Sequence, residues 1–154
     1  MLRSILMGFV AGQRSMTPLA AVAAAARQGT LPPDALLREF VAHPVIAGGT
    51  VALAAAEMAG DKMKSAPDRI VPLGLIARTL TAAYAGAALA RPGERVAGGA
   101  VAVACALGSS YIGWRMRCAA MDRYGQTATG VAEDALVLGS ALTVALSPGL
   151  DRRG

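Results

Sequence analysis

The sequence predicts an all-α fold: a polytopic membrane helical bundle of four to five transmembrane helices in a single domain, residues 1–154. Hydrophobic residues make up 55% of the chain and charged residues only 16%, against roughly 25% charged in a typical soluble domain. The apolar residues are mostly small, and small residues let transmembrane helices pack closely in lipid. An alanine-rich soluble bundle is the alternative, but it would need many more charges on its outer faces.

The first predicted helical segment, about 2–27, is expected to be kinked or broken near Arg14–Pro18. Gln13 and Arg14 interrupt the apolar run, and Pro18 stands where the first turn of a new helix tolerates proline. The early Arg3 and the apolar run after it also resemble a secretory signal peptide. Because the apolar character resumes after Pro18, the broken helix is the preferred interpretation.

Further helical segments follow, separated by turns with proline, glycine or charged residues. They are expected at about 45–62, 70–90, 96–117 and 127–146, with a polar linker at Ala119–Gln126 and an amphipathic, interfacial helix at 34–42. If the first segment is re-entrant, four spans remain and both chain ends share a side. Lysines and arginines divide almost equally between the two sides, so the positive-inside rule leaves the orientation open.

Small residues form two recognisable patterns. Gly8 and Gly12 make a G-x-x-x-G, which is typical of a close-packing helix face. The run Ala47–Ala52 (AGGTVA) recurs as Ala97–Ala102 (AGGAVA), which suggests an internal duplication, although an alanine- and glycine-rich chain also produces such matches by chance. We expect these faces to support a homo-oligomer or contact with a partner membrane protein.

Charged residues inside apolar segments are the candidates for function. Glu57 and Asp61 are four residues apart, which places them on one helix face, and each such charge at a helix centre costs roughly 2.5–3.5 kcal/mol in lipid. They must therefore meet opposite charges, a watery cavity or the membrane surface. The predicted polar cluster comprises Arg14, Ser15, Thr17, Glu57, Asp61, Lys62, Arg78, Glu133 and Asp134.

Two functions fit such a cluster. A small transporter or channel-like protein could use it to bind a proton, a cation or a charged headgroup, because clustered carboxylates can carry protons. Alternatively, the charges form structural ion pairs in a non-catalytic membrane scaffold or assembly factor.

Other functional classes find little support in the sequence. The chain has no G-x-S-x-G, H-E-x-x-H or phosphate-binding glycine loop, so no catalytic residue and no cofactor is predicted; a metal-dependent, lipid-modifying enzyme based on Glu57 and Asp61 is the weakest alternative. Cys105 and Cys118 match no metal-ligand or disulfide pattern. The net charge of +5 comes without a basic, aromatic-containing cluster, which argues against nucleic acid and favours loop arginines facing the lipid bilayer.

Several short motifs, spread over most of the chain, occur together in one known family. They are GQRSMTPLA (Gly12–Ala20), AEMAGDK (Ala56–Lys62), PDRI (Pro67–Ile70), LIAR (Leu75–Arg78) and VAEDAL (Val131–Leu136). In these motifs and their order the chain resembles the uncharacterised bacterial integral-membrane family named domain of unknown function 4126. The resemblance implies a multi-pass helical protein of the bacterial inner (cytoplasmic) membrane, and it implies no particular activity.

Overall fold

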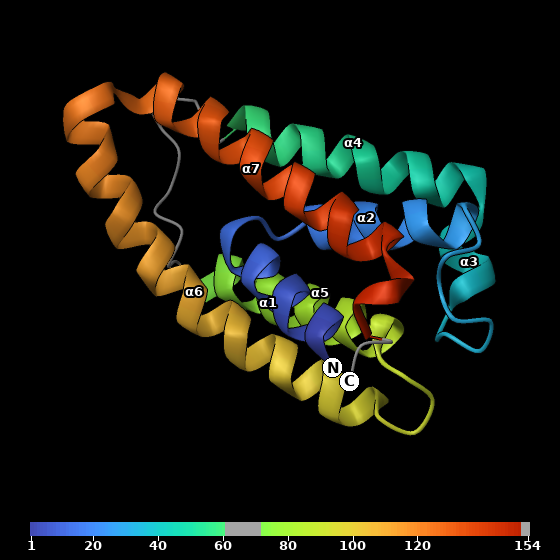
Figure 1. The fold of residues 1–154 in the computed structure, drawn as a ribbon. Helices are drawn as coiled ribbons and strands as arrows, with labels where there is room; N and C mark the ends of the chain where they lie inside the picture. Colours follow the sequence, from blue (N-terminus) through green and yellow to red (C-terminus); the bar gives the residue numbers. More distant parts are fainter. Residues whose placement is uncertain (61–71, 152–154) are drawn as a thin grey trace.

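The computed structural model describes residues 1–60 and 72–151, and this part of the chain is all-α, as predicted (Figure 1). Seven α-helices and a final 3₁₀ turn occur in it, with no strand. Their bounds are α1 Leu2–Gln13, α2 Thr17–Arg27, α3 Arg38–Ala42, α4 Pro44–Gly60, α5 Pro72–Leu89, α6 Arg95–Tyr124, α7 Gln126–Leu146 and η1 Pro148–Asp151.

The first segment is broken where the sequence predicts. Helix α1 ends at Gln13, Arg14 has an extended backbone (φ −140°, ψ 122°), and α2 starts at Thr17 with a proline in its first turn. Proline fits there because the first N–H groups of a helix have no partner within it. The break therefore follows from local backbone chemistry.

The start of α1 and the end of α2 lie at the same end of the bundle. Arg3, at the start of α1, donates from Nε to the carbonyl of Val144 (3.0 Å) and from Nη2 to that of Ala145 (2.5 Å). The hydroxyl of Thr30, just after α2, lies 3.5 Å from the same Ala145 oxygen. The first described residue, Met1, and the last described element, η1 (Pro148–Asp151), also lie here (Figure 1). We call this end, at which α1 begins and α7 finishes, the terminal end.

Helices α1, α5 and α6 pack against one another through glycines. A Cβ added to Gly8 would lie 2.4 Å from the Ala102 carbonyl oxygen, and one added to Gly86 would lie 2.5 Å from that of Gly98. Gly12 meets the backbone of α6 in the same way. The predicted G-x-x-x-G packing face is confirmed. The three helices can approach closely because glycine has no side chain at these contacts.

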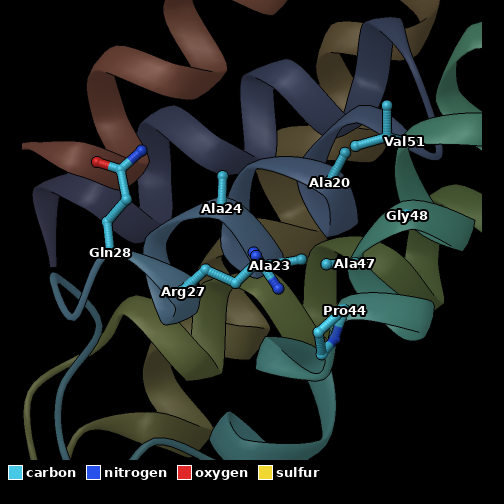
Figure 2. Close-up of a pocket in the computed structure, with 9 residues that line it drawn as sticks. All are labelled: Ala20, Ala23, Ala24, Arg27, Gln28, Pro44, Ala47, Gly48 and Val51. Carbon is cyan, nitrogen blue, oxygen red and sulfur yellow. The ribbon is translucent and has the colours of Figure 1, made fainter.

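The two copies of the AGG motif lie in different environments. Gly98 in α6 is in tight contact with α5, whereas nothing lies within 4 Å of a Cβ added to Gly48 or Gly49 in α4. Beside Gly48 a groove of about 490 Å³ opens between α2 and α4 (Figure 2). The two copies of the motif thus have different structural roles. Assembly of the protein with a second copy or with a partner stays a prediction.

Two predicted boundaries were wrong. The linker predicted at Ala119–Gln126 is helical to Tyr124, because residues 119–124 contain no glycine or proline and the helix ends only at Gly125, whose φ is 80°. The interfacial helix predicted at 34–42 covers only Arg38–Ala42, since Leu37 before it adopts a left-handed backbone (φ 56°).

Two described helices are long and apolar enough to cross a membrane. They contain the candidate spans Arg95–Met121 and Thr127–Leu146, while α4 is apolar but has only 17 residues. Length and composition therefore support two spans directly, fewer than the four to five predicted.

Candidate functional site

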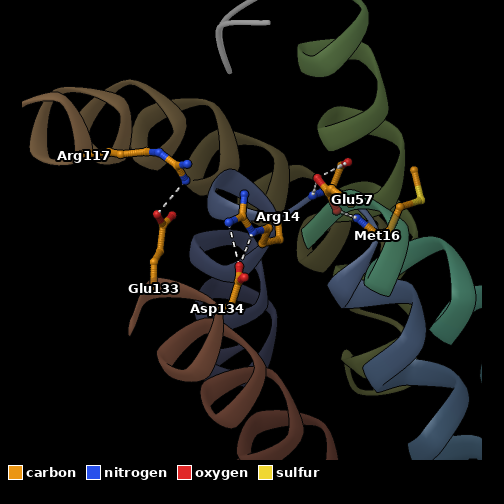
Figure 3. Close-up of polar contacts among 7 residues, drawn as sticks. Arg14, Met16, Glu57, Arg117, Glu133 and Asp134 are labelled. Carbon is orange, nitrogen blue, oxygen red and sulfur yellow. Dashed lines mark hydrogen bonds and ion pairs between the residues drawn. The ribbon is translucent and has the colours of Figure 1, made fainter. Parts of the chain in front are cut away.

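The break between α1 and α2 positions a buried ion pair. Arg14 is 1% exposed, and its Nε and Nη2 donate to Asp134 Oδ1 of α7 at 2.8 and 2.6 Å (Figure 3). Because the backbone of Arg14 is extended, its side chain leaves α1 towards α7. The structure brings these two predicted residues together although 120 positions separate them in the sequence.

Glu57 of α4 binds the same break from the other side. Its Oε1 accepts hydrogen bonds from Ser15 N (2.8 Å) and Ser15 Oγ (2.7 Å), and its Oε2 accepts one from Met16 N (2.8 Å; Figure 3). These N–H groups precede and open α2, where unpaired donors and the helix dipole favour an anion. Glu57 therefore caps α2 from another helix, so backbone N–H groups contribute to the charge compensation that the sequence predicts.

A second ion pair lies nearby, between α6 and α7. Arg117 Nη1 donates to Glu133 Oε2 at 3.2 Å (Figure 3). Arg117 is buried and the Glu133 side chain is 18% exposed. The adjacent acids of the Glu133–Asp134 pair thus bind different arginines, one from α6 and one from the break.

Two further predicted residues, Arg78 of α5 and Thr17, are buried. Thr17, at the start of α2, is fully buried, and its hydroxyl oxygen has no hydrogen-bond partner in the described part of the chain. Asp61 and Lys62 lie outside the described residues.

Four of these charges lie at a similar depth from the terminal end. Arg14 follows the 12 residues of α1, Glu57 is thirteen residues into α4, and Arg78 and Asp134 are eleven and twelve residues before the ends of their helices. At 1.5 Å per residue these distances are about 16 to 20 Å. Charges from four separate helical segments therefore form one layer.

Sequence reasoning missed two buried arginines. Arg117 is not among the predicted site residues, and its position could have been inferred only from the continuation of α6 through Tyr124. In the sequence, Arg3 resembles the early basic residue of a signal peptide, yet it is 3% exposed and donates hydrogen bonds to carbonyls at the end of α7. A lone arginine at the start of an apolar run gives no sign of such a partner.

The negative charges of the site are compensated by arginines and by backbone N–H groups. Each of the three described site carboxylates accepts hydrogen bonds from a cation or from backbone N–H groups. Among the described residues, no three histidine, cysteine or acidic side chains are placed to hold a metal ion. The arrangement can bind or transfer a proton, or lock the helices together.

Substituting Glu57 tests the cap on α2. We expect Glu57→Gln to destabilise the protein by about 1.5–3 kcal/mol, because it replaces charge-assisted hydrogen bonds and turns an amide N–H₂ towards backbone donors. Ser15→Ala removes one of the three bonds and should cost about 1 kcal/mol. Unfolding in mild detergent measures both, with Glu39→Gln on the exposed face of α3 as the control. If Glu57→Gln unfolds like the control, the cap does not contribute to stability.

Comparison with known proteins adds no relative to this description: no protein family, no curated protein and no solved structure matches the chain.

Proposed function

We propose that this chain is a multi-pass integral membrane protein, and the observation that carries the proposal is its inverted surface. Large apolar side chains face outwards, among them Val96 (89% exposed), Leu73 (78%) and Leu136 (72%), while Arg14 and Asp134 are buried. Soluble proteins show the opposite distribution. Only 33% and 28% of the two candidate spans is buried inside the protein, whereas a core helix of a soluble protein would be mostly buried.

The broken helix and the charged layer support a position inside the bilayer. If the terminal end lies at the membrane surface, a layer about 16 to 20 Å deep lies near the middle of a hydrocarbon core of about 30 Å. Helices broken at this depth, with their N-termini directed at anionic groups, are typical of the binding sites of secondary transporters. In this arrangement α1 and α2 are a re-entrant pair, and α4 to α7 are four spans.

The proposed activity is transport or channel-like conduction of a proton or cation, or binding of a charged headgroup, by this polar layer in the bacterial inner membrane. Glu57 is the proposed mobile element. Its three hydrogen bonds all go to the short stretch between two helices, so loss of its charge would release the start of α2 without disturbing the Arg14–Asp134 pair.

Reconstitution of the purified chain into liposomes tests this proposal. We expect a proton or cation gradient to dissipate faster than in empty vesicles, and the combined Glu57→Gln and Asp61→Asn variant to lose most of that flux. Asp34→Asn, in an exposed turn, serves as the matched control for a lost carboxylate. Absence of flux in the unmodified protein would exclude transport of the ions tested.

The second candidate is a membrane scaffold or assembly factor, and the burial of the Arg14–Asp134 pair favours it. Buried ion pairs can fix which helices meet without taking part in any reaction. In that case no ion crosses the liposome membrane, and Glu57→Gln with Asp61→Asn lowers only the unfolding temperature.

A further inference from the structure

One face of α2 and one face of α4 line the groove of about 490 Å³ that opens beside Gly48 (Figure 2). On α2 the lining residues from Ala20 to Arg27 follow the i, i+3, i+4, i+7 spacing of a single helix face. On α4 the lining residues from Pro44 to Val51 follow the same spacing. Between these ends the lining residues are alanines and a glycine, and such short side chains leave the space between the two helices unfilled.

The apolar part of the groove is open to its surroundings. In the described part of the structure, nothing lies within 4 Å of a Cβ added to Gly48, and Val51 at the far end is 57% exposed. Open apolar surface of this kind is unfavourable in water, and on a folded protein it marks a site where another apolar group binds.

The other end of the groove carries one positive charge. Arg27 is exposed, and Figure 2 shows its side chain extending from α2 towards α4. Its Nη1 donates to the carbonyl oxygen of Ala42 at 3.3 Å, and within the described part of the chain Arg27 forms no ion pair. The lining of the groove contains no aspartate or glutamate. The guanidinium is therefore accessible to an anion from outside the chain.

Arg27 lies towards the terminal end of the bundle. It is the last residue of α2, and Thr30, three residues later, reaches the carbonyl oxygen of Ala145 at the terminal end. From Arg27 the groove follows seven residues of α2 to Ala20, a length of about 10 Å. With the membrane placement proposed above, on which this inference rests, Arg27 lies at the level of the lipid headgroups and the groove lies beside the upper acyl chains.

We propose that this groove binds an anionic phospholipid, with the phosphate at Arg27 and one acyl chain between α2 and α4. A guanidinium group matches the oxygens of phosphate in geometry and binds them in a bidentate manner. The volume of about 490 Å³ lies within the usual range of ligand sites. The positive charge at one end and the apolar wall along the rest fit the two parts of such a lipid.

The same charge disfavours a second copy of the chain as the occupant. Two copies that meet through this groove in one membrane would be related by a two-fold axis, so that each presents the same surface to the other. Their Arg27 side chains would then lie at the same depth, beside the same contact. Like charges placed across an interface are unfavourable, whereas an anionic headgroup compensates the charge.

Lipid binding to the full chain in neutral detergent tests the site. Phosphatidylglycerol and phosphatidylcholine with identical acyl chains are titrated separately, and the rise in unfolding temperature gives an apparent affinity for each. We expect phosphatidylglycerol to bind more tightly, because the phosphatidylcholine headgroup carries no net charge. Arg27→Gln should weaken phosphatidylglycerol binding about tenfold, as for the loss of one hydrogen bond to a charged group. Arg115→Gln, at an exposed position on α6, should leave it unchanged.

A second variant tests the acyl-chain part of the groove. Gly48→Leu places a side chain in the open space, so it should weaken binding of both lipids while the lipid-free protein stays folded. Gly139→Leu is the matched control. Gly139 is exposed on α7 outside the groove, and in the described structure nothing lies within 4 Å of its added Cβ.

Equal affinities for the two lipids, an unchanged lipid preference in Arg27→Gln or undiminished binding in Gly48→Leu would each overturn the proposal. So would a dimer, detected by light scattering in lipid-free detergent, that Gly48→Leu dissociates and Gly139→Leu does not, because the groove would then belong to a second copy. Extraction tests the membrane placement separately. A chain that leaves the membrane fraction only with detergent, yet binds both lipids alike, would contradict the lipid site and leave the proposed function intact.

Discussion

Replacing Asp134 with alanine is expected to destabilise the protein by about 3–5 kcal/mol. Arg14 would stay buried at 1% exposure and lose the carboxylate oxygen that both Nε and Nη2 contact. A charge retained in the interior without its carboxylate is the costly outcome. Unfolding of the purified chain in detergent measures the change.

Two further variants make this result interpretable. Asp34→Ala removes the partner of Arg95 in an exposed pair, so its effect should stay within about 1 kcal/mol. Exchanging both members of the buried pair, Arg14→Met with Asp134→Leu, should recover most of the lost stability, because apolar replacements of buried pairs are often neutral. A double variant as unstable as Asp134→Ala would show that the pair has a role beyond charge compensation.

The second large effect is expected for Gly98→Val. Even a Cβ at this position would lie 2.6 Å from the Ala90 Cβ and 2.8 Å from the Gly86 carbonyl oxygen. A backbone oxygen cannot move aside as a flexible side chain can, so α5 and α6 would have to separate. We expect a loss of about 3 kcal/mol, at the upper end for overpacking, measured as the decrease in unfolding free energy.

The repeated AGG motif supplies the matched control for this substitution. Gly48 occupies the same place in the motif as Gly98, and nothing lies within 4 Å of its added Cβ. Gly48→Val should therefore change stability by no more than about 0.5 kcal/mol, as at an ordinary surface position. Equal losses at both positions would mean that valine itself, and not the contact with α5, is responsible.

Features governed by neighbouring residues could be predicted from the sequence. The helices, the break at Arg14 and the G-x-x-x-G face of α1 all depend on backbone preferences or on spacing along one helix. The need for charge compensation was also evident, because the cost of a lone charge in an apolar segment does not depend on the fold.

The partners of those charges could not be predicted. Arg14 pairs with Asp134 and Arg117 pairs with Glu133, while Glu57 accepts hydrogen bonds from the N–H groups of Ser15 and Met16. These pairings depend on which helix faces are turned towards one another, and that is determined by packing between residues 41 to 120 positions apart in the sequence. Residue type alone cannot distinguish adjacent acids.

The amino-acid sequence by itself determined that this protein is all-α, that its first segment breaks near Arg14 and that its interior charges need compensation. Only the tertiary structure decided that the end of α2 lies beside the start of α1 at the terminal end, and that four charges share one layer. It also decided that one AGG motif packs against another helix while the other does not. The physical reason is that backbone preferences act over a few residues, whereas depth, facing and partner choice arise only when separate helices pack.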